Sequence, residues 1–335
     1  MKKGLVNVVA ALAVYAGFAF YLFRPYLGKF DTLDYLFLVN PVLAGVGCFL
    51  LSRRWVSGFW ESLFSGCLYA FGPFLLGLAQ YHPTAGSLAA AIPWLFLPAA
   101  FRPKRKGQWL SLPLCLLAFV AIVVFFQASA YYRLFPVSIQ AKLHLSDLAG
   151  LAAPLVTVKR SLNVVGFYHV PLGVLAVGST MLFNRRRFWV IITFVAGTVL
   201  ASCDSFLGVS PIVWLSVPFV WCCVAAGLGM QALDSAGAAD KGWVLAVAAG
   251  MAGLAIVALL LATRYFQVWA GLADDYAKLF VRTAWMFIAG AVAAGIIFFV
   301  ARAKLRLRWL RLAVLCSAMA ADIVSGAAFV VDRIF

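Results

Sequence analysis

Two aspartates, Asp31 and Asp34, stand three residues apart in the segment RPYLGKFDTLDY, which follows the first long apolar stretch. On a helix this spacing puts both carboxylates on one face. In an irregular loop it still brings them close enough to share a divalent cation, which binds through oxygen ligands. The alternative interpretation is a solvated loop in which Lys29 and Arg24 balance the two acids. The segment is therefore a candidate acidic site, with metal dependence left open.

A second group of polar residues lies in the longer segment 129–163. It contains His144, Asp147, Lys159 and Arg160. The segment is apolar enough to lie on a membrane surface. Its basic pair, Lys159 and Arg160, is a candidate phosphate-binding site, and the alternative is contact with lipid headgroups alone.

Two ionisable residues, His169 and Asp322, fall inside apolar stretches. A charge at bilayer depth is costly, so it normally faces the bundle interior, a cavity or a partner. His169 is predicted to lie about a turn and a half into its helix, where we favour a neutral core histidine over a ligand. Asp322 falls near the middle of the last apolar stretch and needs a partner. Function and structural pairing are equal alternatives for it.

Composition argues against several other kinds of chemistry. Most of the seven cysteines lie in apolar stretches, no C-x-x-C is present, and there are only three histidines, which argues against redox, haem and metal proteins. Neither G-x-x-x-x-G-K-[ST] nor G-x-G-x-x-G occurs, so no nucleotide site is indicated. The net charge is +16, but the basic residues cluster in short segments between apolar stretches, as topology signals do. We expect no nucleic-acid partner.

The elements that position these residues are predicted to be transmembrane helices. The chain is 65% hydrophobic and only 11% charged, with a mean hydropathy of +1.00. A bilayer core of about 30 Å needs about 20 apolar residues per helix. The sequence therefore predicts an all-α polytopic bundle of about 11 spans, which forms a single integral membrane domain over 1–335. The predicted spans are 4–23, 34–52, 58–80, 84–101, 109–128, 164–184, 188–206, 211–233, 243–263, 283–301 and 310–331.

Two segments at the borders of these spans have their own interpretations. The start of the chain, with Lys2 and Lys3, resembles a signal sequence, but its apolar part is long and no A-x-A-like site follows. We interpret it as a retained first helix. The segment RYFQVWAGLADDYAKLFVR, in which Asp274 and Lys278 are spaced for a helical pair, predicts a short amphipathic helix.

Charge predicts the orientation of the chain. About 17 of the 27 basic residues fall in one alternating set of loops, which includes the RPKRK segment at 102–106. Since basic loops remain on the cytoplasmic side, the N-terminus is predicted to be cytoplasmic and the C-terminus extracytoplasmic. The predicted location is a bacterial inner or plasma membrane.

Several stretches carry a likeness to a known family. They are DYLFLVNPVLAGVGCFLLSRRW, ESLFSGCLYAFGPFLLGLAQYHP, LAAAIPWLFLPAAF, SIQAKLHLSDLAGLAAP, FYHVPLGVLAVGSTMLFNRRRFW and PIVWLSVPFVWCCVAAGLGMQAL. In these patterns, from residue 34 to about 233, the chain resembles the GT-C superfamily of polytopic glycosyltransferases. The likeness is greatest to the large bacterial membrane proteins linked to lipoteichoic-acid glycosylation. The last span, with Asp322, also looks like that family's closing helices.

The resemblance implies transfer of a sugar from a polyprenyl-phosphate carrier at the extracytoplasmic face of the cell envelope. The family's catalytic acid lies in the first outer loop, which implies Asp31 or Asp34 as general base. A divalent cation would steady the departing phosphate, and Lys159 and Arg160 would hold it. The chain departs from the family in this loop, which is long there and only about ten residues here.

The sequence leaves three functions open. The first is a compact glycosyltransferase. The second is a non-catalytic scaffold subunit that keeps the GT-C bundle and docks other membrane protein subunits. The third is a transporter of lipid-like cargo, which predicts a polar path on which His169 and Asp322 converge. An outward cavity around Asp31 and Asp34 would favour the enzyme over the scaffold, and exposure of both to bulk water would favour the scaffold.

Overall fold

The computed structural model describes residues 2–78, 83–102, 108–134, 142–161, 165–183, 187–268, 274–302 and 307–335. Within these ranges the chain is helical and contains no named strand. Eight helices or helix pairs are long and apolar enough to cross a membrane, so the protein is a multi-pass membrane protein. These are 4–29, 59–78, 83–100, 111–131, 211–235, 241–264, 275–301 and 308–334.

The remaining three predicted spans correspond to shorter apolar helices. They are α2 (Leu36–Ser52), α9 (His169–Leu182) and α10 (Phe188–Ser202). At 1.5 Å per residue, the 14 residues of α9 reach only about 21 Å, less than a bilayer core of about 30 Å. Every predicted span therefore contains an apolar helix, while the number that cross completely remains a prediction.

The structure corrects several predicted boundaries. The predicted span 58–80 consists of α3 (Phe59–Ala70) and α4 (Pro73–Leu78), and its last two residues lie outside the described ranges. The break lies at Phe71 and Gly72, because Pro73 cannot donate the next helical hydrogen bond. Likewise, 211–233 is divided into α11 (Pro211–Trp214) and α12 (Ser216–Ser235).

The predicted amphipathic helix at 264–282 does not form a separate element. Its described residues extend α13 (Lys241–Val268) and α14 (Asp274–Arg302), which form a long helical hairpin. These extensions contain neither glycine nor proline, the two residues that most disfavour a helix interior, so the helices can continue beyond the apolar stretch. The predicted loop 129–163 also contains helical turns, η4 (Leu145–Leu148), α7 (Ala149–Ala152) and α8 (Pro154–Ser161).

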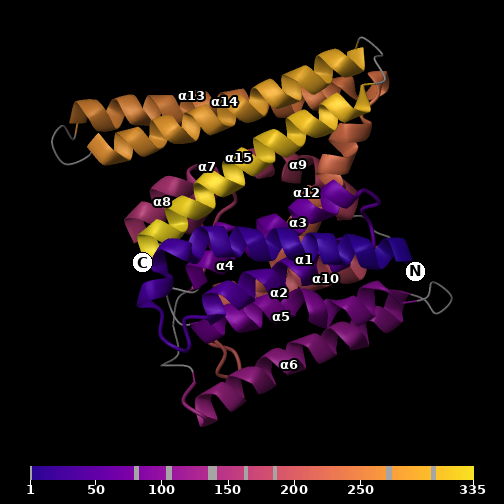
Figure 1. Ribbon diagram of the computed structural model, residues 1–335, viewed down its shortest axis with the longest axis vertical. Helices are drawn as coiled ribbons and strands as arrows, with labels where there is room; N and C mark the ends of the chain where they lie inside the picture. The colour runs from indigo at the N-terminus through magenta and orange to yellow at the C-terminus, as the bar shows by residue number, and fades with distance from the viewer. Residues whose placement is uncertain are drawn as a thin grey trace.

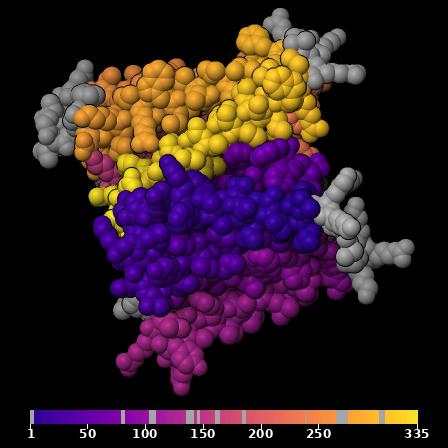
Figure 2. Space-filling view, viewed as in Figure 1, coloured from indigo at the N-terminus to yellow at the C-terminus, as the bar shows by residue number. Residues whose placement is uncertain are grey.

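The bundle is layered around a buried centre. The spans 59–78 and 211–235 are each 94% buried, whereas α1 (Lys2–Phe23), α6 (Ser111–Tyr131) and α13 lie largely at the surface. Figure 1 shows α15 (Arg308–Ile334) running obliquely between the α13–α14 hairpin and α1. The same diagonal band separates the orange and indigo surfaces in Figure 2. The long hairpin contacts the rest of the bundle mainly through α9, α15 and α8.

Successive turns alternate between two opposite ends of the bundle, and the two termini lie at these opposite ends (Figure 1). We call the end with the N-terminus the arginine-rich end and the other the C-terminal end. Hydrogen bonds that join turns at the arginine-rich end are Arg54 to Ala100, Ser57 to Gln231 and Arg308 to Asp234. Those at the C-terminal end are Tyr26 to Asp332, Leu143 to Ala201 and Lys159 to Asp275.

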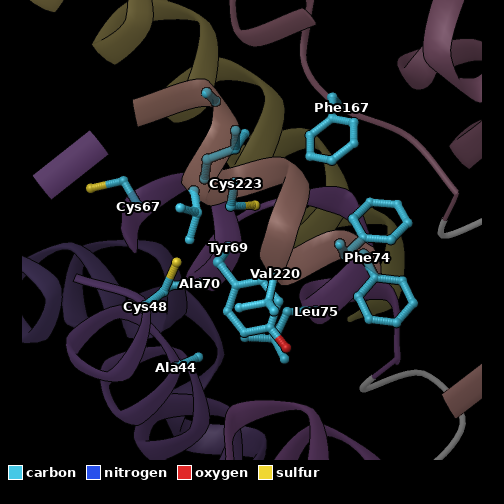
Figure 3. Close-up of a cluster of buried hydrophobic side chains, with 14 of the residues drawn as sticks. Ala44, Cys48, Cys67, Tyr69, Ala70, Phe74, Leu75, Phe167, Val220 and Cys223 are labelled. Carbon is cyan, nitrogen blue, oxygen red and sulfur yellow. The ribbon is translucent and has the colours of Figure 1, made fainter. Parts of the chain in front are cut away.

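The cysteines behave as small apolar residues. All seven are free thiols, and only Cys203 is exposed. Figure 3 shows the sulfurs of Cys48, Cys67 and Cys223 among apolar side chains of the central core. The Cys48 thiol donates a long hydrogen bond of 3.5 Å to the carbonyl of Ser65. This environment fits packing rather than redox chemistry.

Candidate functional site

A basic cavity lies at the C-terminal end, between α8, α14 and α15. Its volume is about 390 Å³. The lining residues are Lys159, Asp275, Lys278, Leu279, Arg282, Phe329 and Arg333. Four basic side chains and one acid give the cavity a net charge of +3 at neutral pH. Basic pockets between membrane helices are suited to lipid phosphate groups.

Helical spacing brings the charges of α14 to one face. Asp275, Lys278 and Arg282 follow one another at intervals of three and four residues, which places them in a row along the helix. Arg282 is fixed by a hydrogen bond of 3.2 Å from its Nη2 to the carbonyl of Ser325 on α15. Arg333 lies four residues after Phe329 on α15 and so shares its face.

Lys159 joins the short helix α8 to this row. Its Nζ lies 2.7 Å from Oδ2 of Asp275 and 5.1 Å from the ring centroid of Tyr276. Its side chain is 26% exposed, so the ammonium is only partly solvated. The structure thus brings this predicted phosphate-binding residue into a cavity with three other cations. The side chain of Arg160, its predicted companion, lies outside the described residues.

The predicted acidic pair lies elsewhere at the same end. Asp31 is exposed and Asp34 is partly exposed, in the turn before α2. Oδ2 of Asp34 accepts a hydrogen bond of 3.0 Å from the backbone N–H of Asp31, so this carboxylate caps its own turn. Neither residue lines the basic cavity or the apolar groove described below. Within the described ranges, no three His, Cys, Asp or Glu side chains gather as metal ligands.

An aromatic cluster connects the turn of Asp31 to the end of α15. The ring of Phe335 lies 5.3 Å from Phe30 and 5.0 Å from Phe37, measured between centroids. The Tyr26 hydroxyl donates a hydrogen bond of 2.7 Å to Oδ1 of Asp332. Because Arg333 follows Asp332, the acidic turn and the basic cavity lie on two sides of the same helix end.

His169 and Asp322 form a closed pair in the core. Nδ1 of His169 lies 2.9 Å from Oδ1 of Asp322, and both side chains are 1% exposed. His169 is the first residue of α9, not a turn and a half into it, because residues 165–168 are not helical and Tyr168 is extended. The edge of its ring faces Phe287 at 4.9 Å. His169 and Asp322 therefore lie together, as the transporter hypothesis predicts. Neither residue lines the basic cavity or the apolar groove described below.

Sequence reasoning missed three residues of the cavity, Lys278, Arg282 and Arg333. The spacing of Asp275, Lys278 and Arg282 was a usable signal, because it repeats at helical intervals. What the sequence lacks is the packing of α8 against α14 and α15, which brings Lys159 to the same place. Comparison of the chain with models of protein families, with curated protein sequences and with solved structures gave no match. The resemblance to GT-C enzymes therefore rests on the sequence patterns alone.

Proposed function

We propose that this membrane protein binds the phosphate of a polyprenyl-phosphate lipid in the basic cavity between α8, α14 and α15. This proposal rests on one observation. One cavity is lined by four basic side chains and a single acid, and the four are Lys159, Lys278, Arg282 and Arg333. Ionised groups hydrogen-bond phosphate oxygens about twice as strongly as neutral groups do. Leu279 and Phe329 supply an apolar wall for the first part of the lipid chain.

The orientation that suits this proposal puts the C-terminal end outside the cytoplasm. The opposite end contains Arg53, Arg54, Arg187, Arg308 and Arg311, and basic turns stay on the cytoplasmic side. The phosphate site would then face the extracytoplasmic surface of a bacterial inner or plasma membrane, where lipid-linked sugars are used in the family that the chain resembles.

The positions of Asp31 and Asp34 favour a protein that binds lipid phosphate without transferring a sugar. Asp31 is exposed to solvent, and Asp34 is occupied by a local backbone hydrogen bond. A general base must come within hydrogen-bonding reach of the acceptor hydroxyl. This form corresponds to a scaffold subunit of a membrane complex that retains a lipid-phosphate site.

Sugar transfer is the second candidate, and the aromatic cluster favours it. Phe30 and Phe335 pack together, so the turn of Asp31 and Asp34 adjoins the helix end that bears Arg333. In this form either aspartate accepts the proton of the acceptor hydroxyl while the cavity holds the phosphate. Unchanged glycan transfer in the Asp31→Asn and Asp34→Asn double variant would remove both residues from the mechanism.

The lipid-phosphate proposal is tested by binding to purified protein in detergent. Polyprenyl phosphate is compared with the polyprenol of the same chain length. We expect tighter binding of the phosphate and a loss of about tenfold or more in the Lys278→Met and Arg333→Met double variant. The control is Arg24→Met with Lys29→Met, because both residues are exposed at the same end outside the cavity. Equal binding of the two lipids, or equal loss in the control, contradicts the proposal.

A further inference from the structure

A second and larger cavity lies at the arginine-rich end, far along the bundle from the phosphate site. It is a groove of about 940 Å³ between α9, the last turn of α12 and the first half of α13. Its walls include Gly173 and Ala176 on α9, and Ala246 and Gly250 on α13. The small side chains leave the space open. The polar side chains of its lining are Thr180, Ser235, Asp240 and Trp243.

The floor of the groove is formed by a methionine that fits against two glycines. Met251 lies so close to Gly173 and Gly290 that a Cβ added at either glycine would approach its side-chain atoms within 2.6 Å and 2.0 Å. Methionine is flexible and fills irregular gaps between helices. The groove is therefore closed on its protein side and open along α13, where Ala246 and Gly250 are exposed.

The length of the groove matches one leaflet of a bilayer. Along α13 its lining residues run from Trp243 to Leu254, which is about 17 Å at 1.5 Å per residue. Half of a hydrocarbon core of about 30 Å is about 15 Å. A transmembrane helix of a partner would need a groove through both leaflets. This groove ends at Leu254, near the middle of α13, and a lipid chain likewise reaches only to the middle of a bilayer.

Asp240 is the one charged side chain among the described residues that line the groove. The Asp240 carboxylate accepts hydrogen bonds from the Gly237 N–H at 2.8 Å and from Trp243 Nε1 at 3.1 Å. These two bonds, with that of Gly237 the stronger cause, hold the pKa of Asp240 below its usual value, so it is ionised at neutral pH. Arg187 is not itself a lining residue, but its Nη1 donates a hydrogen bond to the carbonyl of Met181, which lines the groove on α9.

We propose that the groove binds one phospholipid with a primary-ammonium headgroup, with an acyl chain between α9 and α13. The ammonium pairs with Asp240, and the phosphate lies towards Arg187. Trp243 lies at the level of the headgroup, where indole rings are favoured in membranes. An anionic lipid without an amine lacks the partner for Asp240 and is repelled by it. The site is independent of the phosphate cavity, which lies at the other end.

The test uses the full-length protein, delipidated in detergent and measured by native mass spectrometry with defined lipids. Phosphatidylethanolamine and phosphatidylglycerol with the same chains are compared. We expect phosphatidylethanolamine to bind at least about tenfold more tightly, and Asp240→Asn to abolish this preference. The asparagine retains an oxygen for the Gly237 N–H. Asp204→Asn, at the opposite end, is the charge control and should retain the preference.

Two glycines of α13 provide a test position and a matched control for the binding of the acyl chain. Gly250 lines the groove and Gly253 does not, and no atom lies within 4 Å of an added Cβ at either position. Gly250→Leu should fill the groove and lower lipid binding about tenfold or more, while Gly253→Leu leaves it unchanged. Equal affinity for both lipids, equal effects of the two leucines, or loss of a dimer in Gly250→Leu overturns the proposal. The last result would assign the groove to a second copy of the chain.

Lys278→Met with Arg333→Met should leave phosphatidylethanolamine binding intact, which separates this site from the basic cavity.

Discussion

Asp322, in the middle of α15, caps the N-terminus of α9 by contacting its first two residues, His169 and Val170. Its Oδ1 lies 2.9 Å from the histidine Nδ1, and its Oδ2 accepts a hydrogen bond of 2.6 Å from the Val170 N–H. Val170 is the second residue of α9, so its N–H has no acceptor within the helix. A carboxylate at this position also interacts favourably with the helix dipole. One side chain thus satisfies two buried donors on a neighbouring helix.

Replacing Asp322 is therefore expected to cost more than an ordinary core substitution. Asp322→Ala leaves His169 Nδ1 and the Val170 N–H buried without this acceptor, and should lower the free energy of unfolding by about 3 to 5 kcal/mol. Thermal unfolding of the purified protein in detergent measures the loss. Asp332→Asn serves as the control, because Asp332 is exposed on the same helix. Equal unfolding temperatures for Asp322→Ala and wild type would contradict the capping role.

Variants of His169 separate the two nitrogens of its ring. Nε2 is buried without a hydrogen-bond partner among the described residues, so only Nδ1 has a bond to lose. His169→Asn can present an amide donor near the Nδ1 position and should destabilise less than His169→Ala, by about 1 kcal/mol or more. The two variants are compared by thermal unfolding. An asparagine variant no more stable than the alanine variant would contradict a stabilising role for the bond to Asp322.

Gly326 gives α15 its close approach to α9. A Cβ at this position would lie 2.2 Å from Cε1 of Tyr168, a fully buried ring that also hydrogen-bonds Phe71. Because that ring has no room to move, Gly326→Ala should destabilise by about 1 to 3 kcal/mol. Gly295→Ala is the matched control, since nothing lies within 4 Å of its added Cβ. It should leave stability unchanged or raise it by up to about 1 kcal/mol.

The break between α3 and α4 depends on a hydroxyl from a distant part of the chain. Tyr168 donates a hydrogen bond of 2.7 Å to the carbonyl of Phe71, which lies at this break. Tyr168→Phe keeps the ring but removes the donor, and should cost about 1 to 3 kcal/mol in unfolding experiments. Tyr26→Phe removes an exposed hydrogen bond to Asp332 and should change stability by less than about 0.5 kcal/mol. Similar losses in both variants would argue against a special role for the break.

Length and hydropathy alone predicted where the helices lie, because a bilayer requires long apolar stretches. They did not predict the break at Phe71, the late start of α9 at His169 or the extension of α14 back to Asp274. These features depend on tertiary partners such as Tyr168 and Asp322. The candidate site, too, was predicted from the sequence only in part. The sequence singled out Lys159 as a candidate phosphate ligand, but Arg282 and Arg333, which line the same cavity, come from segments more than 100 residues away in the chain.

Asp275 provides a test of charge in the basic cavity. It is the one acid among the lining residues and pairs with Lys159 at 2.7 Å. Asp275→Asn raises the positive charge by one unit, and a gain of about 1 kcal/mol corresponds to about fivefold tighter phosphate binding. Lys159→Met should weaken binding to a similar degree, and both effects should shrink in high salt. Weaker binding by Asp275→Asn would mean that the acid positions Lys159 and does not merely oppose the anion.

Cys203 is a natural reporter of the orientation of the chain in the membrane. It is the only exposed cysteine of the seven, and it lies at the C-terminal end, where Lys142 contacts the adjacent Asp204. If the arginine-rich turns are cytoplasmic, a membrane-impermeant maleimide should label Cys203 on intact cells, and Cys203→Ser should abolish the signal. In the Cys203→Ser background, Arg54→Cys should react only after the cells are made permeable. The reverse pattern would place the basic cavity on the cytoplasmic side of the membrane, which would exclude an extracytoplasmic role for Lys159 and Arg333.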